Sequence, residues 1–233
     1  MIELKNPDNY NSSWDWCVEH SNYHFDNSRH DQEGEWYTRL GKFQGDWTSE
    51  VQDLKEKTKP ITWATRKFYG DNNDTVSPML PQEENDLRTT GAPVELELTD
   101  MSDNLDQYPT LLAMSNYFGL EDYKRRVHCQ RPGQMFNLHI DKLWDRCPDN
   151  PSRVIRITIM LEDWQPGQFY LYGTGLYSQW RAGEIHIFDW PNVPHATANA
   201  SRFPRSVLQI TGLATDRTRN IIKNSNIDTV HQL

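Results

Sequence analysis

Residues 152–172 read SRVIRITIMLEDWQPGQFYLY. The stretch contains two runs rich in β-branched and aromatic residues, 152–161 and 168–172, joined by a segment that includes Pro166 and Gly167. Such side chains are favoured in strands, and a Pro-Gly pair favours a tight turn between them. The stretch therefore predicts two short strands that follow each other along the chain.

The same pattern continues on both sides of this stretch. Turn sequences such as RPGQ, CPDNPS and RAGE separate further strand-like runs. These runs are VHCQ at 127–130, MFNLHID at 135–141, EIHIFDW at 184–190 and RSVLQITGL at 205–213. Short strands at regular spacing are typical of an antiparallel sandwich or jelly roll. We therefore predict a mainly β, α+β fold of the jelly-roll type with flanking helices.

The first half of the chain has few strand-like runs. We expect short helices at 12–20, 47–58 and 109–119, and a connector at 76–108 that contains one possible strand, PVELELTD. The predicted organisation is an N-terminal helical and irregular extension (1–108) packing on the core, a core at 109–216 and a C-terminal tail at 217–233.

Composition limits the classes of function. The 233-residue chain carries a formal net charge of -9, which disfavours binding to a phosphate backbone. It has no apolar run of the roughly 20 residues that span a bilayer and no recognisable secretory signal. Its three scattered cysteines fit a reducing compartment. We expect a cytoplasmic protein with no membrane and no nucleic-acid partner.

The run MFNLHID carries the first candidate metal ligands. Alternate residues of a strand share a face, so Asn137, His139 and Asp141 are expected to point the same way. A histidine and a carboxylate two apart on a strand can bind one metal from adjacent positions. They would supply two of the three ligands of the facial triad that holds non-haem Fe(II).

A second His-x-Asp pair, His24 and Asp26, competes with the first one. No histidine lies between His30 and His128, so nothing follows that pair at a distance that would close a small sheet. By contrast, residues 142–194 lie between Asp141 and His195 and contain about three predicted strands, which would return the chain beside its start. His24 and Asp26 are therefore interpreted as a loop pair.

Arg205 lies ten positions after His195, at the start of RSVLQITGL. Alternation places it on one face with Val207, Gln209 and Thr211. An arginine that points into a barrel is unfavourable unless it meets an anion. A guanidinium binds a carboxylate through two parallel hydrogen bonds, so a dicarboxylate would suit it. An unpaired arginine on the solvent face remains the alternative.

The spacing of these residues resembles that of the 2-oxoglutarate/Fe(II)-dependent oxygenase superfamily. Its pattern is H-x-D, a gap of roughly fifty residues, a distal His and an Arg about ten residues later. The stretch GEIHIFDWPNVPHATAN, followed by PRSVLQI, resembles the aspartyl/asparaginyl/prolyl hydroxylase branch. The matching positions are Gly183, Glu184, Phe188, Asp189, His195, Asn199 and Arg205. The resemblance covers about residues 123–214.

The resemblance implies a double-stranded β-helix that hydroxylates an amino acid or a peptidyl side chain. Its implied cofactor is Fe(II), held by His139, Asp141 and His195, and its co-substrates are 2-oxoglutarate, anchored by Arg205, and dioxygen. Two departures stand out. Some members of the branch lack the carboxylate ligand, which this chain keeps as Asp141. Many superfamily members carry R-x-S, where this chain has Val207.

Three further residues are secondary candidates. Arg156 could contact the co-substrate, the substrate or only solvent, and Asn137 could support a metal ligand from its face of the strand. His186 could replace His195 as a ligand but has no arginine ten positions later, so it is interpreted as a buried strand histidine.

Two other functions stay open. One is a cupin-like metal protein that uses the same triad without 2-oxoglutarate, for which Arg205 would serve no purpose. The other is a non-catalytic jelly-roll binding module whose histidines are merely buried. Stoichiometric metal binding would exclude the second.

Overall fold

The computed structural model describes residues 37–62, 97–139, 141, 143, 146–190 and 193–233, with only the backbone of Thr62, Glu97 and Asn137 included. The predicted helix at 12–20 and the pair His24 and Asp26 lie outside these residues. None of the described helices is long and apolar enough to span a bilayer.

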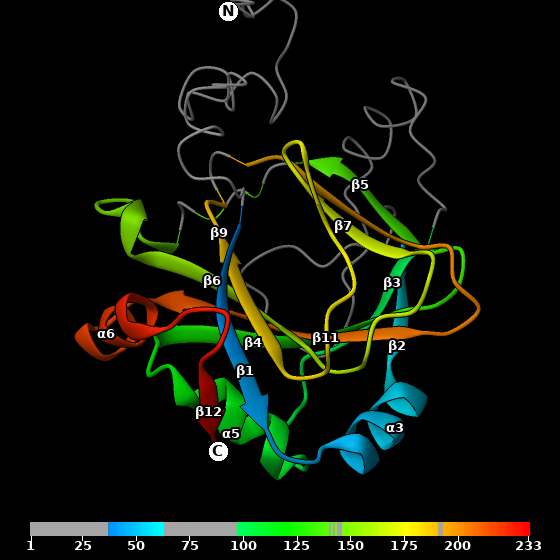
Figure 1. Ribbon diagram of the computed structural model, residues 1–233, viewed down its shortest axis with the longest axis horizontal. Coiled ribbons are helices and arrows are strands. Elements are labelled where there is room, and N and C mark those ends of the chain that lie inside the picture. Colours follow the sequence, from blue (N-terminus) through cyan, green and yellow to red (C-terminus); the bar gives the residue numbers. More distant parts are fainter. Residues whose placement is uncertain (1–36, 63–96, 140, 142, 144–145, 191–192) are drawn as a thin grey trace, which may run out of the picture.

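The described strands form two sheets (Figure 1). The large sheet has eight strands in the order β12-β1-β9-β6-β11-β4-β3-β2. Their bounds are Val230–Gln232, Tyr37–Gln44, Glu184–Phe188, Val154–Met160, Arg205–Leu213, Glu121–Gln130, Glu97–Ser102 and Lys59–Thr62. The small sheet has the order β5-β10-β7-β8, with bounds Met135–His139, His195–Asn199, Gln168–Tyr172 and Gly175–Tyr177. Neighbouring strands are antiparallel except for β12 and β1. This is the predicted double-stranded β-helix.

The two faces of the large sheet pack against different layers. Helices α3 (Thr48–Lys57) and α5 (Pro109–Tyr117) lie below it in Figure 1. Their apolar side chains join an outer core with residues of the sheet such as Ile157, Leu208 and Ile210. The opposite face lines the space between the two sheets, where a second core contains Val207 and several aromatic rings. Residues along β11 therefore alternate between those that pack with the helices in the outer core and those that face the barrel interior.

Several predicted elements are confirmed. The helices expected at 47–58 and 109–119 are α3 and α5, and the six predicted runs from 127 to 213 contain strands β4, β5, β6, β7, β9 and β11. The strand β1, YTRLGKFQ, was not predicted. It contains a bulge between Arg39 and Lys42 and a glycine, Gly41, at φ 90°, which obscure the alternation of a regular strand.

Parts of the predicted extension and tail take part in the sheet. Strands β1, β2 and β3 come from residues before 109 and share the large sheet with β4, β6 and β11. The predicted tail forms helix α6 (Asp216–Asn224) and strand β12, which pairs with β1. The domain boundary at residue 108 stays a prediction. Hydrogen bonds within the large sheet link the described segments that come before and after this residue.

Candidate metal centre

Two neighbouring strands of the small sheet position the candidate ligands. In the pairing of β5 with β10, His139 faces His195 and Phe136 faces Thr197, with an irregularity in register between them. Because His195 and Thr197 are two apart on β10 and share a face, Phe136 and His139 share the inner face too. Leu138 points outward and is 48% exposed.

This bulge changes one expectation from the sequence. Placing Asn137 on the same face as His139 assumed a regular strand, and the irregular register between residues 136 and 139 removes that assumption. The side chain of Asn137 is outside the described part of the chain, so its role beside the metal stays a prediction.

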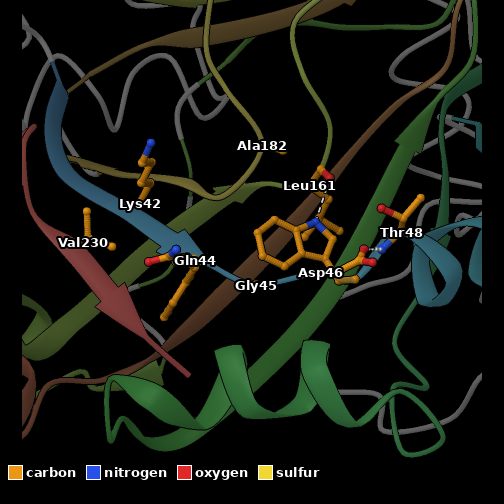
Figure 2. Close-up of a pocket in the computed structure, with 10 residues that line it drawn as sticks. Lys42, Gln44, Gly45, Asp46, Thr48, Leu161, Ala182 and Val230 are labelled. Carbon is orange, nitrogen blue, oxygen red and sulfur yellow. Dashed lines mark hydrogen bonds between the residues drawn. The ribbon is translucent and has the colours of Figure 1, made fainter.

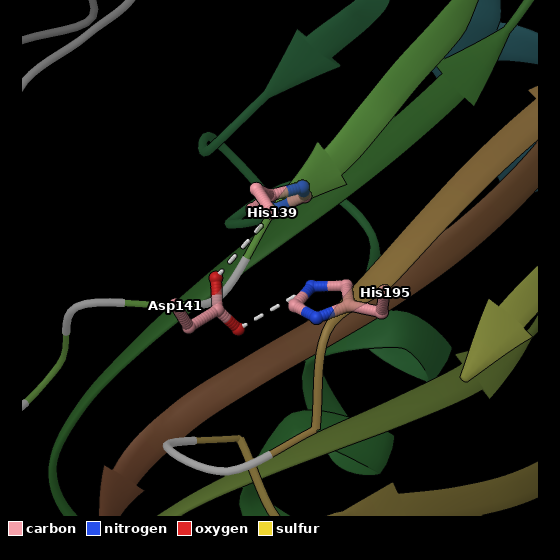
Figure 3. A group of neighbouring side chains, drawn as sticks. All are labelled: His139, Asp141 and His195. Atoms are coloured by element: carbon pink, nitrogen blue, oxygen red, sulfur yellow. Dashed lines mark ion pairs between the residues drawn. The ribbon is translucent and has the colours of Figure 1, made fainter. Parts of the chain in front are cut away.

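The structure brings His139, Asp141 and His195 together (Figure 3). One ligand atom from each residue lies within 4.8 Å of the others. The Asp141 carboxylate faces both rings from one side, with Oδ1 at 3.9 Å from His139 Nε2 and Oδ2 at 3.6 Å from His195 Nε2. A single cation could therefore contact all three side chains after small rotations.

The protonation states of His195 and Asp141 suit metal binding. Burial, together with the neighbouring His139, lowers the pKa of His195 to about 3, so its imidazole is neutral at pH 7. The ring nitrogen Nδ1 lies 3.2 Å from the Val193 carbonyl, and donating a proton there leaves Nε2 free to ligate. Burial alone would raise the pKa of Asp141, but the charge of Arg156, which also donates a hydrogen bond to it, outweighs burial and lowers that pKa. Two imidazoles and one carboxylate form the donor set of a facial triad, which fits Fe(II) and leaves positions for other ligands.

Arg156 on β6 supports Asp141. Its Nη1 donates a hydrogen bond to Asp141 Oδ2, and its Nε donates one of 3.1 Å to the Thr211 hydroxyl. The side chain is 5% exposed, so Arg156 is not the surface arginine that the sequence left open. Contact with a co-substrate or substrate remains a prediction.

Arg205, at the start of β11, is buried at 3% exposure. Its guanidinium lies 4.3 Å above the ring of Tyr170 and 5.9 Å from the centre of the Trp180 ring. It donates to the Phe169 carbonyl at 3.1 Å and to Gln130 Oε1. Within the described residues no carboxylate pairs with it, and its Nε has no hydrogen-bond partner. A buried guanidinium of this kind fits a carboxylate ligand, because an uncompensated buried charge is costly.

Three residues that orient Arg205 or contact the triad were missed from the sequence. Gln130 accepts from Arg205 and donates to the Leu98 carbonyl and the Thr197 hydroxyl at 3.0 and 2.9 Å. The ring of Tyr172 stacks with that of His195 at a centroid distance of 6.0 Å and with that of Tyr170 at 5.7 Å. The alternation in QFYLY could have placed both tyrosines on one inner face, whereas Gln130 had no comparable signal.

His186 lies apart from the described metal-ligand cluster, as predicted for a strand histidine. It is fully buried, and its Nε2 lies 2.8 Å from the Tyr172 hydroxyl. Burial, helped by the charge of Arg205, lowers its pKa to about 3, so the ring is neutral. It packs among the aromatic rings beside the site.

Two residues of the stretch 183–199 shape the site without being metal ligands. The ring of Phe188 packs edge-on against His195 at 4.6 Å. Asn199, at the end of β10, donates to the carbonyls of Gln130 and Phe203 at 2.7 and 2.8 Å. It also accepts from the backbone and hydroxyl of Ser201. Asn199 therefore holds the turn that leads into Arg205.

A separate hollow of about 480 Å³ lies where β1 leads into α3 (Figure 2). Lys42, Asp46, Trp47 and Val230 are among its lining residues, and Trp47 donates to the Leu161 carbonyl at 2.8 Å. None of the residues of the triad lines it, so it is distinct from the candidate metal centre.

No family model and no curated protein matches the sequence. Among solved structures, the chain is similar to a prolyl-4-hydroxylase from Pseudomonas putida (18% identity, 79% of this chain and 96% of that one, TM-score 0.42). It is also similar to a Trichoplax adhaerens prolyl hydroxylase in complex with a hypoxia inducible factor peptide fragment (10%, 83% and 89%, TM-score 0.49). A sugar phosphate isomerase of the cupin superfamily from Silicibacter pomeroyi matches over less of the chain (14%, 40% and 52%, TM-score 0.31).

These identities and TM-scores are too low to transfer a function. The assignment of the fold rests on the chain's own geometry. Two sheets pack together, His139 and His195 lie on the adjacent strands β5 and β10, and Asp141 follows β5. The chain is a mainly β, double-stranded β-helix protein in which an H-x-D…H triad, His139, Asp141 and His195, comes together as a potential metal site.

Proposed function

We propose that this protein is an Fe(II)- and 2-oxoglutarate-dependent dioxygenase that hydroxylates an amino acid or a peptidyl side chain. The observation that carries the proposal is the pairing of one facial-triad donor set with one buried guanidinium that no described carboxylate neutralises. The triad accounts for Fe(II), and Arg205 accounts for a carboxylate-bearing co-substrate.

The positions of the two groups favour one bound molecule between them. Arg205 lies above Tyr170, and Tyr172, two residues further along β7, is the strand partner of His195. The guanidinium of Arg205 therefore lies at the level of Tyr170, and the metal ligand His195 lies at the level of Tyr172. These two levels are about 7 Å apart along the strand. A short dicarboxylate could be held by Arg205 at one end and reach the metal at the other.

The chain's own residues would bind, orient and exclude water. His139, Asp141 and His195 would hold the ion on one side, and Gln130 and the Phe169 carbonyl would keep Arg205 aimed at the distal carboxylate. Tyr170, Tyr172 and Trp180 are buried and would keep water from this part of the barrel. When bound, Fe(II) with 2-oxoglutarate supplies the oxidation of a substrate C–H bond by dioxygen, coupled to decarboxylation of 2-oxoglutarate to succinate.

A cupin-like metal protein is the second candidate, favoured by the same triad. It predicts metal binding without any effect of 2-oxoglutarate. Arg205 is buried without a described carboxylate partner, so a cupin-like protein would bury this charge with no ligand to neutralise it, which is energetically costly.

The decisive experiment is anaerobic addition of Fe(II) and then 2-oxoglutarate to the full-length protein. We expect a weak metal-to-ligand absorption band and a rise in melting temperature that needs both additions. A band-free, folded sample that binds iron would favour the cupin-like reading. A folded sample that binds no metal would leave only the non-catalytic module.

A further inference from the structure

We propose that His128 binds the co-substrate together with Arg205, by donating a hydrogen bond to the same carboxylate. The inference rests on the proposed function and deepens it, because it adds a neutral donor to a site that otherwise depends on one guanidinium. His128 lies outside the sequence pattern that identified the triad and Arg205. Strand pairing and the contacts of its ring point to this role.

The side chain of His128 points into the space between the two sheets. Gln130, two residues further along β4, donates to the hydroxyl of Thr197 on the opposite sheet at 2.9 Å, so alternate residues of this part of β4 face inward. Val127, between these inward positions, belongs to the outer core. The ring of Phe136, on the inner face of β5, packs edge-on against the His128 ring with centroids 6.1 Å apart. His128 therefore belongs to the inner face of the large sheet.

The register of the strands places His128 beside Arg205. Arg205 on β11 lies opposite Gln130, and Val207 lies opposite His128, so His128 and Arg205 are diagonal neighbours on the inner face. Diagonal neighbours of an antiparallel pair are roughly 7–8 Å apart, which is within reach of long side chains. The charge of Arg205 also acts on the His128 imidazole. One carboxylate could therefore lie between the two side chains.

The ring nitrogens of His128 can accommodate a ligand. Both are shielded from solvent and make no hydrogen bond of good geometry within the described part of the chain. Gln209 is a polar neighbour, but one amide group can satisfy only one of the two ring nitrogens. Burial, helped by the charge of Arg126, lowers the pKa of His128 to about 3, so the ring is neutral and carries one N–H group. A buried N–H without a partner is unfavourable, and a bound acceptor would remove that cost.

The residues next to His128 leave this donor role to it. Its partners on the two adjacent strands, Val207 and Met101, are apolar. Both amide protons of Gln130 are donated to other groups, one to a carbonyl and one to a hydroxyl. A carboxylate has two oxygens that each accept more than one hydrogen bond, so the guanidinium of Arg205 alone does not satisfy it. An imidazole N–H beside Arg205 would supply a further donor.

The test compares two keto acids that differ at one end. 2-Oxopentanoate has the chain length and the keto acid end of 2-oxoglutarate, but a methyl group replaces the distal carboxylate. Each compound is titrated anaerobically into the full-length protein loaded with Fe(II), and the absorption band reports binding. We expect His128→Phe to weaken binding of 2-oxoglutarate about tenfold or more, because a hydrogen bond to a charged group is lost. Affinity for 2-oxopentanoate should change by less than about threefold, because that ligand lacks the contact.

Two further variants separate a contact with the ligand from an effect on the fold. His128→Gln keeps an N–H donor, so it should retain part of the affinity for 2-oxoglutarate that His128→Phe loses. His231→Gln is the matched control. His231 is also buried, but its ring nitrogens contact the Tyr117 hydroxyl and the Leu40 carbonyl beside the outer core. We expect His231→Gln to change neither affinity.

A second measurement observes the imidazole in the unaltered protein. Zn(II) replaces Fe(II), and NMR follows the histidine ring signals. The signals of His128 are assigned by their absence from whichever of the two His128 variants folds. They should shift when 2-oxoglutarate binds and stay nearly unchanged with 2-oxopentanoate. This comparison decides the proposal even where His128→Phe does not fold.

Three results would overturn the proposal. His128→Phe could weaken both keto acids equally, it could leave the affinity for 2-oxoglutarate unchanged, or the ring signals of His128 could respond to neither ligand. The first result would mean that His128 only supports the fold, and the other two that Gln209 or a water satisfies its ring. Absence of the band in the unaltered protein, before any substitution, is a different failure, because it removes the dioxygenase assignment itself.

Discussion

At the scale of single residues, Arg205 is the side chain that separates a 2-oxoglutarate enzyme from other proteins with the same triad. Replacing it by glutamine removes a buried charge but keeps hydrogen-bonding capacity. We expect Arg205→Gln to bind metal normally and to bind 2-oxoglutarate about 30-fold or more weakly. Titration of 2-oxoglutarate into the metal-loaded protein measures this. Arg202→Gln is the matched control, because Arg202 is exposed and three residues away; equal losses in both variants would refute the role of Arg205.

Asp141 belongs to the same scale. We expect Asp141→Ala to abolish turnover and to weaken metal binding, because it removes the one anionic ligand of the triad. The same change at Asp26, in the competing His-x-Asp pair, should leave both intact. Metal titration monitored by fluorescence or calorimetry compares the two variants. A similar loss from each would mean that the metal is held elsewhere.

At the scale of elements, the turn between β10 and β11 sets the direction of Arg205. The side chain of Asn199 makes three hydrogen bonds within this turn and a fourth to the Gln130 carbonyl on β4, and the residue is 1% exposed. We expect Asn199→Ala to lower the free energy of unfolding by about 2–4 kcal/mol, because buried carbonyls lose their donor. Urea denaturation measures the loss. Asn224→Ala, at an exposed position on α6, should stay within about 0.5 kcal/mol of the unaltered protein; a small effect at Asn199 would contradict its role in the turn.

The junction of β9 with β1 and β6 depends on Gly183. Its φ is 88°, and a Cβ there would lie 2.5 Å from the Phe43 carbonyl oxygen. We expect Gly183→Ala to cost about 1–2 kcal/mol for the backbone conformation and about 1–3 kcal/mol more for the clash with the main chain. Gly133 has nearly the same φ, 90°, with nothing within 4 Å of its Cβ position. Gly133→Ala should therefore show the conformational cost alone, and equal losses of stability in thermal melts would argue against the clash.

The strands and helices also show how far the sequence predicts elements. Runs such as RSVLQITGL and QFYLY were recognisable because branched and aromatic residues alternate between turn sequences. Strand β1 was not, because its bulge and Gly41 interrupt the alternation. Strands β8 and β12 are three residues each, too short for any period to appear.

At the scale of the whole molecule, buried neutral histidines couple stability to pH. Burial lowers the pKa of His128 and His186 to about 3, below the usual value of 6.5. Below pH 6.5 the unfolded chain therefore binds protons that the folded protein does not, so stability falls with decreasing pH until about pH 3. Each histidine contributes a slope of up to about 1.4 kcal/mol per pH unit in this window.

This predicts that the metal-free protein loses stability between pH 7 and pH 5, measured by urea denaturation. His186→Gln keeps a polar group beside the Tyr172 hydroxyl but removes one titrating ring. Its slope should be smaller by roughly 1 kcal/mol per pH unit below pH 6. An unchanged slope would mean that His186 does not titrate differently in the folded and unfolded states.

Local chemistry in the sequence determined the jelly-roll class, the positions of most strands and the four residues His139, Asp141, His195 and Arg205. These follow from side-chain alternation, from turn residues and from the spacing between ligands, which are all properties of short segments or of order along the chain. The choice between the two His-x-Asp pairs followed from spacing too, because only His139 and Asp141 are followed about fifty residues later by a histidine with an arginine ten positions beyond it.

Tertiary structure decided the rest. The bulge in β5 sets which residues share the face of His139, the pairing of β6 with β11 places Arg156 opposite Thr211, and the packing of the two sheets brings Arg156 to Asp141. Gln130 meets Arg205 because β4 and β11 are neighbours. Such contacts join residues far apart in the chain, and their formation depends on strand register and burial, which no local pattern of residues contains.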